Sequence, residues 1–88
     1  MNVSFLRSFE KSTALIKDKK LSEAVVASIQ SVKRATGLKQ IPNLKKLKGS
    51  QNAYGIRLGN YRIGVWVDRN TVFFVVFDHR KDIYKKFP

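Results

Sequence analysis

This chain of 88 residues has no cysteine, a single histidine and few carboxylates. The absence of cysteine excludes disulfides and any zinc site built from thiolates. The lone His79 and six scattered Asp and Glu residues do not form the ligand cluster of a metal site, so we expect no metal ion and no other cofactor. No apolar run approaches the roughly 20 residues that span a bilayer, and the first residues lack the pattern of a signal peptide. The expected compartment is the cytoplasm, without a membrane partner.

The shortage of acid is concentrated in residues 24–67, a run of 44 residues that contains eight Lys or Arg residues and no carboxylate. The formal net charge of the whole chain is +12. A soluble domain normally intersperses both signs of charge, because unbalanced like charge repels itself in the compact state. This excess predicts a polyanionic partner, an acidic protein partner, or both in turn. Nucleic acid is the obvious polyanion, since each neutralised phosphate releases counterions and adds affinity.

A hydrophobic content of 43% is ordinary for a globular protein and predicts one domain spanning residues 1–88. Apolar residues at helical spacing predict a first helix from Phe5 to about Asp18 and a second from Leu21 to a C-cap at Gly37. Apolar runs separated by turn residues indicate β-structure in the second half. The remaining expected elements are a short strand at 1–5, a connector at 41–49, strands at 54–58, 61–67 and 72–77, and a helical turn or tail at 78–88.

The dipeptide Gly59-Asn60 is typical of a two-residue hairpin loop. Such a loop pairs Arg57 with Arg62 on one face of the sheet, where like charges directly opposite destabilise the pairing unless an anion lies between them. The neighbours on that face are glycines, which leave space for something to approach the backbone. An alternative is that both arginines are ordinary solvated strand residues.

The second predicted hairpin, with Arg69-Asn70 as its loop, places several aromatic rings on the arginine-bearing face. Aromatic rings beside arginines can stack bases and grip phosphates. The alternative is that the rings belong to the core or to a partner interface, and a register slip of one residue would invert the faces. The residues expected on this face are Trp66, Phe73, Val75, Phe77 and His79.

Two segments resemble the RelE/ParE toxin superfamily of bacterial toxin–antitoxin systems. The first is Tyr-Gly-Ile-Arg-Leu-Gly-Asn-Tyr-Arg-Ile-Gly at 54–64, and the second is Asp-His-Arg-Lys-Asp-Ile-Tyr at 78–84. Residues 41–49 are similar to the segment that precedes the sheet in the same family. The resemblance covers the whole chain and implies an α+β fold, in which two N-terminal helices pack on a small twisted antiparallel sheet, with a short C-terminal helical turn.

The resemblance implies a ribosome-dependent endoribonuclease that cuts mRNA in the ribosomal A site. The ribose 2′-hydroxyl would attack the adjacent phosphate, and no metal is needed. Arg57, Arg62 and Arg80 match the family's phosphate-gripping basic residues, Tyr84 matches its suggested base, and His79 lies at a position that is basic in several members. Further residues expected to bind RNA are Lys45, Lys46, Lys48, Trp66 and Lys81.

One departure concerns position 55, where RelE-like strands often carry a basic residue and this chain has Gly55. The alternatives are a ParE-like inhibitor of DNA gyrase and a nucleic-acid-binding member without catalysis. All of these readings predict an acidic antitoxin that folds on binding and forms a hetero-oligomer with an otherwise monomeric toxin. The antitoxin could cover the arginines or displace the turn that carries Tyr84.

Overall fold

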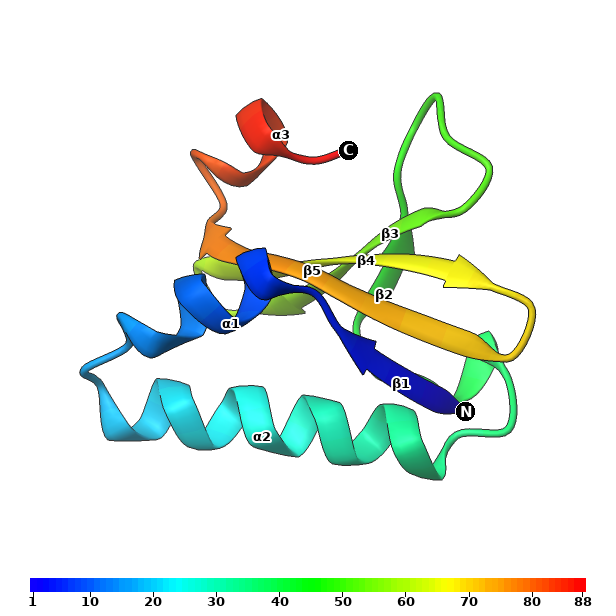
Figure 1. Cartoon of the computed structure of the whole chain (residues 1–88), viewed down its shortest axis with the longest axis horizontal. Helices are drawn as coiled ribbons and strands as arrows, with labels where there is room; N and C mark the ends of the chain where they lie inside the picture. Colours follow the sequence, from blue (N-terminus) through cyan, green and yellow to red (C-terminus); the bar gives the residue numbers. More distant parts are fainter.

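The computed structural model describes all residues 1–88 and contains one five-stranded sheet. In chain order the elements are β1 (Asn2–Phe5), α1 (Arg7–Ala14), α2 (Lys19–Arg34), the 3₁₀-helix η1 (Leu38–Gln40), β2 (Leu44–Lys46), β3 (Ala53–Leu58), β4 (Tyr61–Asp68), β5 (Thr71–His79) and α3 (Ile83–Lys86). The strand order is β1-β5-β4-β3-β2, and α2 and α3 lie on opposite sides of the sheet (Figure 1). No helix combines the length and apolar character needed to cross a membrane.

The sheet is mixed, so the expectation of an antiparallel sheet was wrong at one edge. Strands β2 to β5 pair antiparallel, but β1 lies parallel to β5. Two parallel neighbours need a long crossover connection, and between β1 and β5 the chain from α1 to the end of β4 forms this connection. The four residues of β1 contain no signal that specifies their direction.

The two N-terminal helices are confirmed, but their ends differ from the prediction. The first helix ends at Ala14 because Asp18 is extended and caps α2, with its carboxylate accepting a hydrogen bond from Leu21 N at 3.2 Å. Helix α2 ends at Arg34. Gly37 is therefore not the C-cap but precedes η1, and the expected connector contains both η1 and β2.

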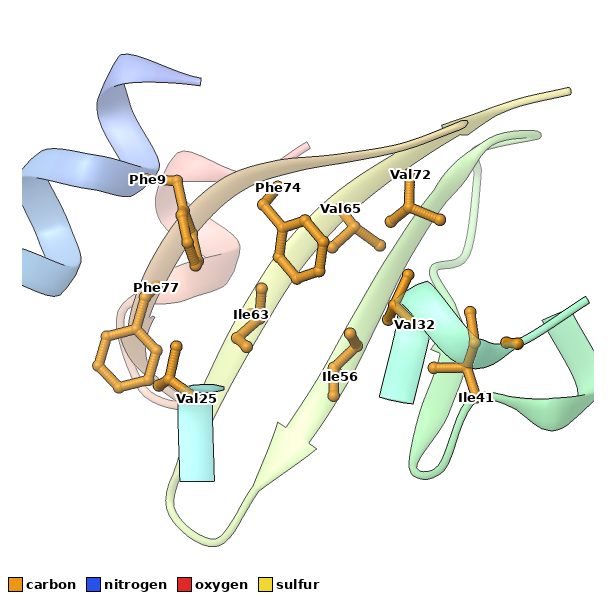
Figure 2. Packing of buried hydrophobic residues seen from close by; sticks show 11 residues of the cluster. Phe9, Val25, Val32, Ile41, Ile56, Ile63, Val65, Val72, Phe74 and Phe77 are labelled. Carbon is orange, nitrogen blue, oxygen red and sulfur yellow. The ribbon is translucent and has the colours of Figure 1, made fainter. Parts of the chain in front are cut away.

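The main core lies between α1, α2 and one face of the sheet (Figure 2). Helix α1 contributes Phe9 and helix α2 contributes Val25 and Val32. From the face of the first hairpin opposite Arg57 and Arg62, Ile56 and Ile63 are fully buried in the same cluster. The opposite face of the sheet carries a smaller buried cluster, to which α3 contributes.

Helix α1 also replaces a strand neighbour along part of β5. Strand β1 pairs only with residues 71–74 of β5. Beyond that point the Ser8 hydroxyl donates to the Val75 carbonyl, and the Ser12 hydroxyl oxygen accepts from Phe77 N at 3.0 Å. The two serines therefore satisfy backbone groups that no strand reaches.

We expect Ser12→Ala to lower the free energy of unfolding by about 1–3 kcal/mol, because the part-buried Phe77 N–H loses its acceptor. Urea unfolding measures this loss. The matched control is Thr13→Ala, since the Thr13 hydroxyl bonds only carbonyls of its own helix. Equal effects of the two changes would contradict a specific role for Ser12.

Candidate functional site

The expected register of the first hairpin is confirmed. Arg57 lies directly opposite Arg62, and Gly55 lies directly opposite Gly64. Alternation along the strands places these four residues on the face of the sheet away from α1 and α2. We call this surface the arginine face.

The C-terminal segment occupies the space above the two glycines. A Cβ atom placed on Gly64 would lie 2.6 Å from the ring of Phe87, and one placed on Gly55 would lie 3.8 Å from the Tyr84 hydroxyl. Phe87 and Ile83 are buried in a second, smaller cluster on this side of the sheet. The approach to the backbone that the glycines predict is therefore made by the chain itself, through α3.

A concave site of about 280 Å³ opens beside Tyr84 on the arginine face. The side chains that line it are three cations, a phenol and an amide, and one glycine completes the lining. Its lining residues are Asn43, Lys45, Gly55, Arg57, Arg62 and Tyr84. The structure thus brings together four of the residues expected from the sequence, all of which can interact with an anion.

Asn43 is the lining residue that the sequence analysis missed. Its backbone φ is 62°, in the left-handed region, and it follows Pro42 immediately before β2. Pro followed by Asn is a signal for a turn whose third residue has positive φ. That signal could have located the turn, but not its position beside Arg57.

The guanidinium of Arg62 is held by the hairpin turn. Its Nη1 atom donates to the carbonyls of Gly59 at 2.7 Å and Tyr61 at 2.8 Å. Three of the five guanidinium N–H groups therefore remain without a partner in the chain. A guanidinium held in this way can donate hydrogen bonds to two oxygens of a phosphate, and the side chain loses little conformational entropy on binding.

Arg80 reaches the same turn from the end of β5. Its backbone N–H donates to the carbonyl of Asn60 at 2.8 Å, and its exposed side chain lies outside the pocket lining. Arg80 is therefore a residue of the rim, at the same end of the sheet as Arg62.

The three lysines in and after β2 differ in their position relative to the pocket. Lys45 pairs with Gly55 and lines the pocket, whereas Lys46 pairs with Tyr54 and therefore points to the other face. Lys48 lies in the loop after β2, and Lys81 lies in the turn after β5. Only Lys45 is placed to act inside the pocket.

A bulge in β5 overturns part of the expected aromatic surface. The register shifts between Gly64 and Val65, so that Phe77 pairs with Ile63 and His79 pairs with Tyr61. The prediction that Phe77 and His79 share a face with the arginines was therefore wrong. Both rings pack against Tyr61 instead, with centroid distances of 5.2 Å and 5.3 Å.

Trp66 and Phe73 lie opposite each other on the arginine face, as expected. The indole of Trp66, however, packs edge-to-face on Phe87, with ring centroids 5.1 Å apart. It supports α3 and is not a free platform for a base, which favours the alternative that this ring is part of a packed cluster.

An ion pair fastens α3 to the end of β5. Lys86 Nζ lies 2.7 Å from Asp78 Oδ2. The hydrogen bond from Lys86 lowers the pKa of Asp78 below its ordinary value of 3.8, and the same bond raises the pKa of Lys86 above 10.5. No group of three or more His, Asp or Glu side chains is placed to hold a metal ion.

No protein-family model matches the chain. The toxin RelE3 of Methanocaldococcus jannaschii is 37% identical over 90 residues, and the alignment covers 100% of both proteins. A chain of the RelB–RelE antitoxin–toxin complex from Methanococcus jannaschii superposes with a TM-score of 0.80 at 33% identity, covering 96% of this chain and 98% of that one. The YoeB dimer of Staphylococcus aureus has a TM-score of 0.73 at 21% identity, covering 91% of this chain and 97% of that one, and shares the fold.

We expect Gly64→Ala to destabilise the protein by about 1–3 kcal/mol, because the new methyl group would overlap the ring of Phe87. In a Phe87→Ala background the same change should cost much less, since the ring is gone. Urea unfolding followed by the fluorescence of Trp66, the only tryptophan, measures both effects. Additive effects of the two substitutions would contradict this contact.

We expect the attachment of α3 to weaken in acid. Because the pKa of Asp78 is lowered in the folded state, its contribution to stability is present above pH 3.8 and is lost as the pH falls through the lowered value. The Lys86 side chain is 61% exposed, so added salt should reduce the effect. Trp66 fluorescence during acid titration reports the release, and Asp78→Asn should remove this transition. Identical titrations of the two proteins would contradict the pair's role.

Proposed function

The chain belongs to the RelE toxin family, and we propose that it is a ribosome-dependent endoribonuclease that cuts mRNA without a metal ion. One observation carries the proposal: Arg57, Arg62, Lys45 and Tyr84 surround a single pocket on the arginine face. This combination provides cations for a phosphate and a hydroxyl for proton transfer at the same place.

Arg57 and Arg62 form the phosphate site in this proposal. Two like charges directly across a pair of strands are unfavourable until an anion lies between them, so a bound phosphate relieves the repulsion. Negative charge accumulates on the phosphate as a fifth oxygen bonds to phosphorus. Guanidiniums that are already oriented stabilise this charge without reorganisation, and Arg62 is oriented by the turn carbonyls.

The cleavage step uses the ribose 2′-hydroxyl as nucleophile. A bond forms between the 2′ oxygen and phosphorus, and the bond from phosphorus to the 5′ oxygen of the next nucleotide breaks. The products are a 2′,3′-cyclic phosphate and a 5′-hydroxyl. The nucleophile loses a proton and the leaving oxygen gains one. We assign proton transfer to Tyr84, which is 55% exposed and whose hydroxyl lies over Gly55.

Arg80 and the outer lysines have a different role in the proposal. Arg80 at the rim would contact the RNA backbone next to the reacting phosphate. Lys46, Lys48 and Lys81 lie outside the pocket and would add long-range attraction to ribosomal RNA and mRNA. His79 pairs with Tyr61 and faces away from the arginine face, so we assign it no role in the cleavage step.

An acidic antitoxin is the proposed protein partner. The net charge of +12 favours fast association with an acidic chain, and neutralising that charge relieves the repulsion among the toxin's own cations. The structurally similar RelB–RelE protein was solved as an antitoxin–toxin complex. In the proposal the free toxin is a cytoplasmic monomer, and the inhibited form is a hetero-oligomer.

Mapping of transcript ends after induced expression tests the proposal. We expect new cuts within translated codons that disappear when translation is blocked. Arg62→Ala should reduce cutting about 10²–10³-fold, because a fixed donor to the developing charge is lost. Tyr84→Phe should reduce it about 10²–10⁴-fold through loss of proton transfer.

The matched control is Tyr61→Phe, which removes a phenolic hydroxyl from the opposite face of the sheet. It should leave cutting unchanged. Full cutting by both the Arg62 and Tyr84 variants would overturn the assignment of the site. Growth arrest with intact mRNA would instead favour a ParE-like inhibitor of gyrase.

A further inference from the structure

Asn43 is the one uncharged amide in the pocket lining. Lys45, Arg57 and Arg62 can only donate hydrogen bonds, whereas an amide presents a donor and an acceptor side by side. Asn43 is exposed, and its amide makes no hydrogen bond to the rest of the chain. Its hydrogen-bonding groups are therefore available to a ligand.

The backbone holds Asn43 in a defined place. Its carbonyl accepts a hydrogen bond from Arg57 N at 3.1 Å, which extends the pairing of β2 with β3 by one residue. Pro42 restricts the turn from the other side, because its ring fixes its own φ. The amide thus stands next to Arg57, at the end of the row formed by Arg57 and Arg62.

The lining of the pocket offers two kinds of contact to RNA: cations that bind phosphates, and an amide that can bind a base. Contacts from cations to phosphates position a nucleic acid but carry no sequence information. Sequence in single-stranded RNA is read from the hydrogen-bonding edges of splayed bases. Every splayed base presents a donor beside an acceptor on its Watson–Crick edge, and an asparagine amide can pair with either arrangement. Adenine alone presents a second such pair on its Hoogsteen edge, a donor at N6 beside an acceptor at N7.

We propose that Asn43 is a specificity-determining residue that binds the base of a nucleotide next to the phosphate held by Arg57 and Arg62, with adenine preferred. This inference rests on the proposed function, since it takes RNA as the ligand of the pocket. It adds a base contact to a site whose other side chains recognise the backbone.

A purely structural explanation of Asn43 makes a different prediction. Asparagine and glycine are the residues that adopt positive φ most readily, so Asn43 could be present for its backbone alone. Asn43→Gly separates the two explanations, because glycine accepts the same backbone conformation and lacks the amide. Asn43→Asp keeps the shape of the side chain but removes its donor.

The test measures binding of short single-stranded RNAs of one base each, protected by 2′-O-methyl groups so that they are not cut. We expect the wild-type chain to bind oligo-A about tenfold or more tightly than oligo-U, as for a good amide–adenine contact. Asn43→Gly should bind both oligomers with nearly equal affinity. Asn43→Asp should also lose the preference for oligo-A, and it should bind both oligomers more weakly because its carboxylate repels the phosphates. Urea unfolding of Asn43→Gly should match that of the wild type.

Two results would overturn the inference: no preference in the wild type, or an unchanged preference in Asn43→Gly. An unchanged preference with an equal loss of affinity for both oligomers in Asn43→Gly would show that the amide binds the RNA backbone. Transcript mapping decides the proposed function separately. A chain that prefers oligo-A through Asn43 but cuts no transcript would contradict the proposed function and leave this inference standing.

Discussion

The packing of the C-terminal segment on two facing glycines is the contact on which the rest of the site depends. Gly55 and Gly64 leave a depression in the sheet, in which the Phe87 ring lies against Gly64 while Tyr84 lies over Gly55. Helix α3 has only four residues and could not form alone, so its position is determined by this packing. Without it, the hydroxyl of Tyr84 would not stand beside the arginines.

The second constraint is electrostatic: the repulsion between Arg57 and Arg62 destabilises the fold, whereas the packing of the C-terminal segment stabilises it. Arg62 on β4 is paired with Arg57 on β3 and with Asp78 on β5, so a carboxylate lies on the strand next to the arginine pair. That carboxylate is paired with Lys86 instead, and the Arg62 guanidinium bonds only turn carbonyls. The arginines consequently keep their capacity for an external anion. The burial that offsets their repulsion comes from the core on the other face of the sheet.

The parts of the site that could be predicted from the sequence are those set by local chemistry. Gly59-Asn60 specifies a two-residue turn, and the turn specifies that Arg57 faces Arg62. The bulge in β5 could not be predicted, because Val75 and Val76 are both apolar and no alternation marks the extra residue. The faces of Phe77 and His79 were wrong for that reason. The packing of Phe87 was missed because an aromatic residue in a charged terminal segment has no periodic pattern around it.

The glycine at position 55 departs from the pattern of RelE-like strands, and the structure has another cation on the neighbouring strand. Lys45 is the register partner of Gly55 on the neighbouring strand and lines the same pocket. A side chain on β2 thus supplies a cation on the strand next to Gly55, while Tyr84 and Leu47 lie over the glycine itself. Since one fold supports many functions, this local set of groups, and not the likeness of the fold, is the physical argument for phosphate chemistry in this chain.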